Sequence, residues 1–574
     1  MDDSLPPEIN IITLNCWGLK FNISKLRKER LEEIGRQLSQ AQPTPHIVCL
    51  QEVWAYDDYL TIRRILRALL PHGKFYYSGS FGAGLAILSR WPIEESTMSP
   101  YTLNGRPTAF WRGDWYVGKG IAQAIIRYGP DPDDLLSVFN THTHAPYSSD
   151  SEDSYRVHRE AQSWQLAKLL RAAVERGHLV VAAGDFNMTP LSTEHRILTA
   201  HAPVRDVWRV LHPRSSLGAV SEPREKARRR PTPSAEYNLI ENGATSNSVY
   251  NTWRWPRAEQ ARLGPGKPLR QVAPETPDPH GQRLDYIFTS TAARELDDHG
   301  TIGGWVVRDA RVGMVARHPE LGCSLSDHFS VEATLVFHTT TREGPTGAPS
   351  ISNWPLPPGR LSILSAFRRS TPLLMQPSDG ATPGDTENDD GQDTDPAAGG
   401  TFLSLPSPTP STSRHSLPPT SHDTLGVDFD TQLLDSISPS HTDGQQFSSA
   451  DYSALLTEIK LYKAREVDQV RLRTAHFIFW LFTLIACCIA IWFIPTHGKA
   501  LTEAQNHGVN FVLLILSSIG LVAGCIDGLM ALLFFKGSEK RALNEFEWEI
   551  RNAKRIALGE AGAAVEEVEA RKYN

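Results

Sequence analysis

The stretch LVVAAGDFN, Leu179–Asn187, decides how the first part of this chain is interpreted. Its first five residues are apolar and include two β-branched valines, which is typical of a strand that is buried on both faces. An acid and an amide, Asp185 and Asn187, follow at once. A single acid after a strand is most often a turn residue, so this pattern needs repetition before it indicates a site.

The same arrangement of an apolar run and a polar group recurs along the N-terminal part of the chain. The runs are INIITLN, HIVCLQE, LSVFNTH, RLDYIF and SLSDHF. The polar residues that end or interrupt them are Asn15, Glu52, His142, Asp285, Asp327 and His328. When successive strands present acids, amides and imidazoles at one end, these groups converge on one edge of the sheets. The sequence therefore predicts an α/β domain with a metal and phosphate site at that edge.

Composition divides the 574 residues into regions. Residues 1–338 alternate strand-like and helical patterns and form the predicted catalytic domain. Residues 339–450 are dominated by Ser, Pro, Thr, Gly and Asp, as in PSPTPSTSRHSLPPTSHD, so we expect a disordered linker. The net charge of −7 excludes a generic polyanion binder. The six cysteines show neither zinc-site nor disulfide spacing, which favours a reducing compartment.

Residues 451–574 contain two apolar segments, at about 475–495 and 510–535. Ala475–Ile494 has no charged residue, and Val509–Phe535 has only Asp527. A helix rises about 1.5 Å per residue, so roughly 20 residues cross the hydrocarbon core of a bilayer. With the polar stretch PTHGKALTEAQNHG between them, the segments predict a transmembrane helical hairpin. The alternative is a pair of buried helices in a soluble domain, which the all-round apolarity disfavours.

Basic residues predict the orientation of this hairpin. Those that flank the two spans are Lys460, Lys463, Arg465, Arg471, Arg473, Lys536, Lys540 and Arg541, whereas the turn holds only Lys499. By the positive-inside bias, the catalytic domain and both termini face the cytosol. The N-terminus MDDSLPPEIN also lacks the pattern of a signal peptide. The flanking charged helices either lie against anionic headgroups or have solvated faces, and the sequence leaves both open.

The words LNCWG, LQEVW, NTHTHA, GDFNMTP, LDYIF and SDHF resemble, in this order, the endonuclease/exonuclease/phosphatase superfamily. They span nearly all of about the first 335 residues. The resemblance implies a four-layered α/β sandwich with two central sheets, and Mg²⁺ as the cofactor. It also implies a role for each residue. Glu52 and Asn15 would bind the metal, His142, Asp185 and Asn187 would polarise the phosphate, His328 would be the general base, and Asp327 or Asp285 would position imidazoles or water.

Elementary chemistry agrees with these residue types. Mg²⁺ is a hard cation that prefers oxygen ligands and keeps several waters, so one carboxylate together with the substrate phosphate is an adequate ligand set. Hydrolysis also needs a base whose pKa lies near neutrality and which a carboxylate holds in place, and His328 fits this need. We assign the neighbouring His144 to structure.

Three stretches, LNCWGLKF, FGAGLAILSRWPI and WRGDWYVGKGIA, are similar to the neutral sphingomyelinases and especially to the fungal inositol phosphosphingolipid phospholipase C proteins, which also carry two C-terminal spans. Gly113–Gly120 fits the start of a nucleotide-binding loop, but Gly120 stands where Ser or Thr would hold Mg²⁺, and a strand-like run follows. We therefore expect no ATP binding. The resemblance implies instead a P-loop-like element in which Asp114 and Lys119 bind substrate. The alternative is a surface salt bridge.

The leading hypothesis is a membrane-anchored, Mg²⁺-dependent phospholipase C-type hydrolase that converts sphingomyelin or inositol phosphosphingolipids into ceramide and a phosphorylated headgroup. The resemblance implies activation by anionic phospholipids, and we expect the membrane of the endoplasmic reticulum or of mitochondria. We expect no nucleic acid partner. The alternatives are a nuclease or an inositol polyphosphate phosphatase of the same superfamily, and a catalytically inactive membrane scaffold. A scaffold would be free to lose Glu52, Asp185 or His328, and all three are present.

One basic run, EPREKARRRPTP (Glu222–Pro233), has two interpretations. It is either a solvated loop or a contact with anionic phospholipid. Because a dense charge run is solvated by default, we slightly favour the loop.

Overall fold

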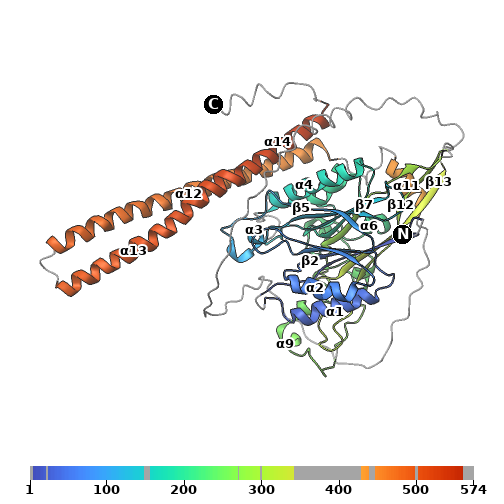
Figure 1. Ribbon diagram of the computed structural model, residues 1–574, viewed down its shortest axis with the longest axis horizontal. Coiled ribbons are helices and arrows are strands. Elements are labelled where there is room, and N and C mark those ends of the chain that lie inside the picture. Colours follow the sequence, from blue (N-terminus) through green and yellow to red (C-terminus); the bar gives the residue numbers. More distant parts are fainter. Residues whose placement is uncertain are drawn as a thin grey trace. The chain divides into compact units, whose positions relative to one another are not determined.

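The computed structural model describes residues 4–20, 23–147, 155–268, 270–297, 300–341, 428–437, 447–497 and 502–559 (Figure 1). The helices and strands all fall within one unit, Met1–Arg342 with Val427–Leu558. The second unit, Glu343–Gly426 with Gly559–Asn574, lies outside the described residues apart from Gly559. Most of the predicted linker therefore also lies outside the described residues.

Two sheets form the centre of the N-terminal domain. The strands of the seven-stranded sheet are, in spatial order, β11 (Arg294–Glu295), β12 (Thr301–Gly313), β13 (Ser330–Thr341), β1 (Glu8–Asn15), β2 (Ile47–Gln51), β4 (Leu85–Ser89) and β3 (His72–Tyr76). Those of the six-stranded sheet are β5 (Ile93–Pro100), β6 (Gly120–Arg127), β7 (Leu135–His142), β8 (Leu179–Asp185), β10 (Asp285–Thr289) and β9 (Arg205–Asp206).

Apolar residues on both faces of these strands create four layers. In β1, Ile11 packs between the sheets, whereas Ile12 packs against the outer helices α1 (Arg27–Gln40) and α2 (Tyr56–Leu66). Strand β8 repeats this alternation: Val181 faces the other sheet and Val180 faces the opposite helix layer. The helices of that layer are α4 (Arg156–Glu175) and α5 (Thr193–His201). Figure 1 shows α1 and α2 on one side of the strands and α4 on the other. The predicted four-layered sandwich is confirmed.

The remaining short elements lie in the connections of this domain. They are the 3₁₀ turns Phe110–Arg112 and Thr252–Arg254 and the helices α3 (Asp114–Val117), α6 (Val207–Leu211), α7 (Pro223–Ala227), α8 (Ala235–Ile240) and α9 (Arg257–Gln260). The basic run that was predicted as a loop begins with α7, and its Arg224 donates to Thr189 Oγ1 at 2.7 Å and to the Pro190 carbonyl at 3.1 Å. This end of the run is therefore tied to the loop that follows Asn187.

Helix α11 (Phe429–Ile437) lies in the range that the sequence assigned to a disordered linker. Its Leu433 is fully buried against Ile302 and Val306 of β12, and the backbone N–H of Val307 donates to Gln432 at 2.9 Å. A short helix is therefore present inside the range predicted as a linker, because it covers an apolar face of the sheet. Its neighbours rich in Ser, Thr and Pro masked this signal.

Two long C-terminal helices, α12 (Ser449–His497) and α13 (Glu503–Leu529), run side by side (Figure 1). A π-helix, Met530–Glu539, and α14 (Lys540–Ala557) continue α13 without a break. By length and composition, both long helices are apolar enough to cross a membrane, with mean hydropathies of 2.2 and 2.4 in their most apolar windows. Asp527 of α13 pairs with Arg473 and, at 2.7 Å, with His476 Nδ1, both on α12.

The charged helices that flank these spans pack on the catalytic domain. Leu455 and Ile459 of α12 and Leu543 and Ile550 of α14 belong to the same buried cluster as the residues of α4. The ammonium of Lys168 also donates to Glu549 of α14 at 2.6 and 2.8 Å. The apolar faces of these helices therefore cover α4, and whether their charged faces meet headgroups or solvent stays a prediction.

Candidate active site

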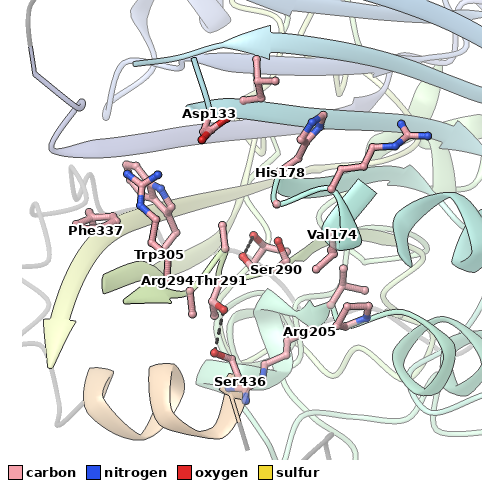
Figure 2. A pocket seen from close by; sticks show the side chains of 18 of the residues that line it. Asp133, Val174, His178, Arg205, Ser290, Thr291, Arg294, Trp305, Phe337 and Ser436 are labelled. Carbon is pink, nitrogen blue, oxygen red and sulfur yellow. Dashed lines mark hydrogen bonds between the residues drawn. The ribbon is translucent and has the colours of Figure 1, made fainter. Parts of the chain in front are cut away.

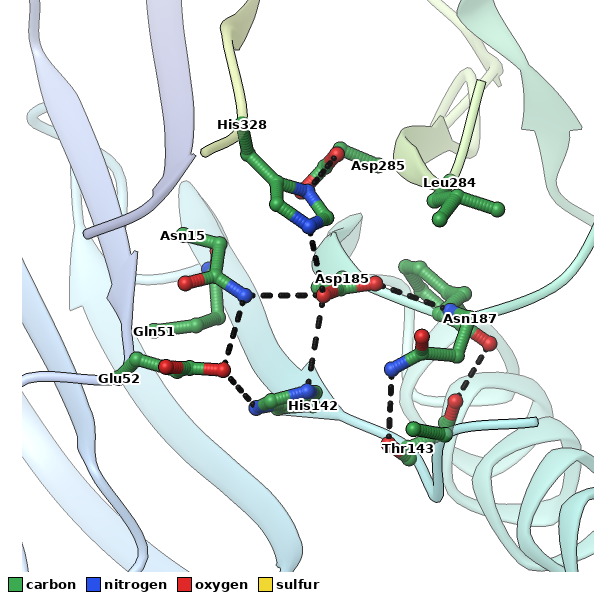
Figure 3. Close-up of polar contacts among 12 residues, drawn as sticks. Asn15, Gln51, Glu52, His142, Thr143, Asp185, Asn187, Leu284, Asp285 and His328 are labelled. Atoms are coloured by element: carbon green, nitrogen blue, oxygen red, sulfur yellow. Dashed lines mark hydrogen bonds and ion pairs between the residues drawn. The ribbon is translucent and has the colours of Figure 1, made fainter. Parts of the chain in front are cut away.

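Strand direction brings the predicted polar residues to one edge of the two sheets. Strands β1 and β2 are parallel, as are β7 and β8, so the residues at their carboxyl ends share an edge. Strand β10 is antiparallel to β8, and therefore its first residue, Asp285, lies opposite Asp185. His142 lies opposite Asp185 on the other side. Figure 3 shows these side chains pointing toward one another, together with Asn15, Glu52 and His328.

Asn15 holds two carboxylates at the centre of this site. Its amide nitrogen donates to Asp185 Oδ2 at 2.9 Å and to Glu52 Oε1 at 3.3 Å. Its amide oxygen accepts the backbone N–H of Trp17 at 3.0 Å, and this contact fixes which way the amide faces. An amide nitrogen has no lone pair for a cation. This orientation favours Asn15 as the group that spaces the carboxylates, and its predicted role as a metal ligand stays a prediction.

The backbone of Glu52 is held in an uncommon conformation. Glu52 has a positive φ of 56°, and its carbonyl accepts the N–H of Gly18 at 2.9 Å. A Cβ atom at Gly18 would lie 2.4 Å from that carbonyl oxygen, so only glycine fits there. A non-glycine residue with this φ costs about 1–3 kcal/mol, which the surrounding contacts offset. The glycine of the LNCWG word therefore aims the Glu52 side chain into the site.

Burial outweighs the positive charges near two carboxylates of the site, Glu52 and Asp185. Burial, with the nearby charge of Asp327, raises the pKa of Glu52 to about 7. Burial also raises the pKa of Asp185 to about 6, although His328 acts in the opposite direction. Within the described residues, Glu52 Oε2 and Asp285 Oδ1 are buried without a hydrogen-bond partner. Buried acids with raised pKa values fit a divalent cation, because the nearby His328 and Lys119 only partly offset the cost of burying their charge.

A second grouping of possible metal ligands overlaps the first. One ligand atom each of Asp185, Asp285 and His328 lies within 4.8 Å of the others. However, Asp285 Oδ2 lies 2.8 Å from His328 Nδ1, as in a hydrogen-bonded carboxylate–imidazole pair. A hard cation prefers oxygen to nitrogen, so Glu52 and Asp185 are the better ligands for Mg²⁺.

His328 is strongly paired. Asp285 accepts from its Nδ1, and its Nε2 lies 3.9 Å from Asp185 Oδ2. Burial lowers the pKa of His328, but Asp285 and Asp185 outweigh it and raise the pKa to about 10. The two carboxylates therefore favour the charged ring, whereas the sequence predicted a pKa near neutrality. The difference arises because two buried carboxylates, rather than one, face the ring.

His142 lies in the opposite electrostatic environment. Lys119 Nζ lies 3.1 Å from His142 Nε2, 2.9 Å from Asp114 Oδ1 and 2.9 Å from the Thr143 carbonyl. Burial and the Lys119 charge hold the pKa of His142 well below its usual range. An ammonium is only a donor, so Nε2 of the neutral ring accepts and Nδ1 carries the proton. That Nδ1 is buried and has no hydrogen-bond partner among the described residues.

Asp114 and Lys119 were predicted to bind substrate, with a surface salt bridge as the alternative. Their side chains are only 4% and 5% exposed, so the pair is not a surface salt bridge. The three contacts of Lys119 are with protein groups, and they place it behind His142. The P-loop-like segment therefore supports a site histidine, and direct contact with substrate stays a prediction. The strand expected after it is β6.

The two residues Asn187 and Asp327 complete the predicted set. Asn187 donates its backbone N–H to Asp185 Oδ1 at 3.0 Å and its side-chain amide to the Thr143 carbonyl at 3.1 Å. Asp327 is half-buried beside Ser326, whose hydroxyl lies 3.4 Å from its carboxylate. The sequence could not say whether Asp285 or Asp327 holds an imidazole. The structure assigns that contact to Asp285.

A pair of amides joins the two sheets below the site; the sequence pointed to Asn140 as a polar group at a strand end but missed Gln51 and the contact between them. Gln51 of β2 donates to Asn140 Oδ1 of β7 at 2.8 Å. Asn140 in turn donates to the carbonyls of Leu50 and Ala86, both at 2.9 Å. Both amides stand in words that drew attention chiefly for other residues, LQE and FNTH. The sequence signal was their position: Asn140 stands two residues before His142, and Gln51 stands one residue before Glu52.

A separate cavity of about 550 Å³ lies at the other ends of these strands (Figure 2). Its lining includes Leu135, the first residue of β7, and Thr289, the last residue of β10. The site residues His142 and Asp285 stand at the opposite ends of the same two strands. The cavity is therefore distinct from the candidate active site.

Comparison with known proteins now identifies the family. Residues 12–328 match the Endonuclease/Exonuclease/phosphatase family. The chain belongs to this family.

Within the endonuclease/exonuclease/phosphatase family, the chain has named relatives. It is 41% identical to the inositol phosphosphingolipids phospholipase C of Schizosaccharomyces pombe over 330 residues, which cover 57% of this chain and 68% of the relative. It is 32% identical to sphingomyelin phosphodiesterase 2 of Rattus norvegicus over 365 residues, covering 63% and 71%. The crystal structure of sphingomyelinase C from Streptomyces griseocarneus matches with 17% identity and a TM-score of 0.35, covering 57% of this chain and 99% of that one.

This family member is an enzyme. The relatives that it matches over more than half of its length are named a phospholipase C and a phosphodiesterase. Both names describe hydrolases of phosphodiester bonds, and the residues of the candidate site are of the types that this reaction needs.

Proposed function

We propose that this chain is a membrane-anchored, Mg²⁺-dependent phospholipase C-type hydrolase of sphingophospholipids, which releases ceramide and a phosphorylated headgroup. One observation carries the proposal. A chain 41% identical to an inositol phosphosphingolipids phospholipase C gathers Glu52, Asp185, His142 and His328 at one sheet edge. Sphingomyelin and inositol phosphosphingolipids are the two candidate substrate classes, because relatives named for each are found.

Glu52 and Asp185 are the residues that would hold the cation. Their raised pKa values and the unpartnered Glu52 Oε2 support this assignment. When bound, Mg²⁺ supplies Lewis-acid polarisation of the phosphate and a positive charge between the carboxylates.

His142 and Asn187 are assigned to the phosphate. The Nδ1–H of a neutral His142 is a buried donor without a hydrogen bond among the described residues, and its contact with Glu52 Oε1 is long, at 4.0 Å, so it is available to a non-bridging phosphate oxygen. Lys119 keeps this proton on Nδ1 by occupying Nε2. Asn187 is oriented by its bonds to Asp185 and Thr143. A donor held ready for developing charge stabilises the transition state more than a mobile one.

His328 and Asp285 form the acid–base pair of the proposal. Asp285 holds Nδ1, so Nε2 is the nitrogen that exchanges a proton with water or with the leaving alcohol. A base needs the neutral ring, whereas the two neighbouring carboxylates favour the charged one. Because Asp185 is one of the carboxylates that raise the pKa of His328, compensating its charge shifts His328 toward the neutral form.

The arrangement along the chain is part of the same proposal. Residues 1–338 form the catalytic domain, 339–450 the linker, interrupted by α11, and 451–574 the membrane hairpin. The hairpin keeps the site close to a substrate that diffuses in two dimensions. Basic flanks support a cytosolic catalytic domain and cytosolic termini, and the host membrane is that of the endoplasmic reticulum or of mitochondria. Anionic phospholipid is the proposed activator.

A headgroup-resolved assay tests the proposal. The full-length chain is reconstituted in vesicles with Mg²⁺, and ceramide release is measured from sphingomyelin and from inositol phosphoceramide, with and without anionic lipid. Glu52→Gln and His328→Ala are each expected to lower turnover by about 10²–10⁴-fold. Glu29→Gln changes an exposed acid of α1 and serves as the matched control.

Two outcomes would overturn the proposal. The first is no ceramide release from either lipid under any of these conditions. The second is unchanged turnover in Glu52→Gln or His328→Ala. Hydrolysis of DNA or of an inositol polyphosphate in place of lipid would move the chain to another branch of its family.

A further inference from the structure

Four aromatic side chains lie exposed in two neighbouring loops of the catalytic domain. Trp111 is 85% exposed, Phe110 61%, Phe81 58% and Trp115 40%. We refer to these four residues as the aromatic patch.

The two loops that carry the patch are bonded to each other. The backbone N–H groups of Ser80 and Phe81 donate to the Tyr116 carbonyl, at 2.9 and 3.2 Å. The Tyr116 ring lies 5.2 Å from that of Phe110 and 5.0 Å from that of Trp115. The patch is therefore a built surface in which one half-buried ring supports the exposed ones. Single exposed apolar residues are ordinary, but several large rings gathered in one place mark an interaction surface.

The second candidate span touches this patch. The Trp115 ring lies 6.2 Å from the ring of Phe534, at right angles to it. Phe534 is near the end of the apolar segment Val509–Phe535, and Lys536 follows that segment directly. The patch therefore lies where the chain would leave the hydrocarbon core. Tryptophan and other aromatic residues are enriched at that depth, because their rings suit the headgroup region.

The same stretch of chain also reaches the active site. Asp114 is adjacent to Trp115 but is 4% exposed and pairs with Lys119 at 2.9 Å. Lys119 contacts His142 at 3.1 Å. The same short segment therefore exposes the Trp115 ring on α3 and, through Asp114 and Lys119, supports His142, the proposed phosphate donor.

From these contacts we propose that the aromatic patch inserts into the headgroup region of the lipid bilayer and fixes the catalytic domain against the membrane. The proposal rests on the proposed membrane anchoring of the chain. Because Trp115 contacts Phe534 of the candidate span, we infer that lipid, rather than a protein partner, covers the patch. Insertion keeps the P-loop-like segment at the membrane plane, so a lipid phosphate reaches His142 without leaving its leaflet.

A fluorescence experiment on the full-length chain tests insertion without relying on turnover. Cys488 and Cys525 are exposed and the other four cysteines are buried, so Cys488→Ala with Cys525→Ala gives a background for labelling. Trp111→Cys in that background carries an NBD label. Tyr237→Cys provides a matched control, because Tyr237 is a 49% exposed ring on α8. Both proteins are reconstituted in vesicles that contain either headgroup-proximal or mid-chain doxyl lipids.

The label at position 111 is expected to shift its emission to the blue and to be quenched more by the headgroup-proximal doxyl lipid, whereas the label at 237 responds to neither. A label at 111 that behaves like the one at 237 would overturn the proposal. So would a label at 111 that is shielded from aqueous iodide yet not quenched by either lipid, because another protein segment or a second copy would then cover the patch.

Activity provides a second readout. Phe110→Ser with Trp111→Ser removes the most exposed rings, and turnover of vesicle substrate is expected to fall roughly tenfold, because interfacial binding scales with buried apolar area. Turnover of a water-soluble short-chain substrate is expected to stay within about twofold, since these rings do not touch the site. An equal loss on both substrates would overturn the proposal. If no substrate is turned over at all, the proposed function fails and the fluorescence result still decides on insertion.

Discussion

The two histidines of the site differ in the neighbours that set their charge. His328 faces two carboxylates, Asp285 at 2.8 Å and Asp185 at 3.9 Å, which hold it in the charged form. His142 faces the Lys119 ammonium at 3.1 Å, which holds it neutral. Both rings lie near Asp185, since its Oδ2 is also 3.5 Å from His142 Nε2. One carboxylate therefore serves two imidazoles that have opposite protonation states.

This difference separates the chemical duties of the two rings. A ring whose charge is set by two acidic neighbours suits proton exchange, whereas a ring that stays neutral suits a fixed hydrogen bond to phosphate. Environments that push the pKa values of similar groups apart are a general way to divide acid–base work. The variants below alter one side of the comparison at a time, beginning with the largest expected effect.

Removing His328 has the largest expected effect. His328→Ala takes away the proton-exchanging ring and leaves Asp285 buried without its partner, so we expect turnover to fall by about 10²–10⁴-fold. Steady-state kinetics on reconstituted protein measures this loss, and circular dichroism checks the fold. A similar loss in His144→Ala, a ring outside the proposed acid–base pair, would contradict the specific role of His328.

Removing the Glu52 charge changes stability with pH in the metal-free chain. Its pKa rises from an ordinary 4.5 to about 7, so the stability that it contributes is fully present below pH 4.5 and is lost as pH rises through 7. The loss amounts to about 3 kcal/mol. We expect Glu52→Gln to flatten this decline, and Mg²⁺ to raise the melting temperature of the parent chain at pH 7.5. Chemical denaturation at pH 5 and pH 7.5, with EDTA, provides the measurement. If the free energy of unfolding changes equally with pH in the parent chain and in Glu52→Gln, Glu52 is not the cause of the decline.

Removing the Lys119 charge tests the other side of the comparison. In Lys119→Met, His142 loses the neighbour that occupies Nε2 and disfavours its protonation, so its pKa rises and the charged form appears at higher pH. We expect turnover to fall by roughly 10–10²-fold and the acid limb of the pH–rate profile to move upward. Lys119→Arg is the control that keeps the charge. A loss of rate with an unchanged pH profile would make Lys119 merely structural.

The smallest expected effect is that of Tyr147, which reaches His142 only through Asp114 and Lys119. Tyr147 donates its hydroxyl to Asp114 Oδ2 at 2.5 Å, but Asp114 also pairs with Lys119 and lies 3.5 Å from His144 Nε2. Tyr147→Phe removes one of these contacts, worth about 1 kcal/mol, so we expect turnover to change by less than about threefold. A larger loss would show that Tyr147 reaches substrate. The comparison is with Tyr250→Phe, another tyrosine of the catalytic domain.

The layers and the shared edge could be predicted because they follow from alternation and strand order. Apolar runs that end in Glu52, His142 or Asp185 show where strands stop, and the motifs around them occur in the same order as in the family. Charge states could not be predicted in this way. They depend on which groups face a ring across the sheets, as with Lys119 at His142 and two acids at His328. Helix α11 was missed for a related reason, since only its contact with β12 distinguishes it from the surrounding polar sequence.

Asp527 has a consequence for how the chain is made. An acid in a lone span raises the free energy of membrane insertion, by about 2.5–3.5 kcal/mol when it lies at the centre and by less toward the ends. Asp527 lies past the middle of Val509–Phe535, so its cost is smaller. Its partners Arg473 and His476 belong to the preceding helix, 54 and 51 residues earlier, so they leave the ribosome first. In the proposed membrane topology, pairing with the first helix therefore lowers the free-energy cost of inserting the second. Deletion of the first helix is then expected to make insertion of the second less favourable.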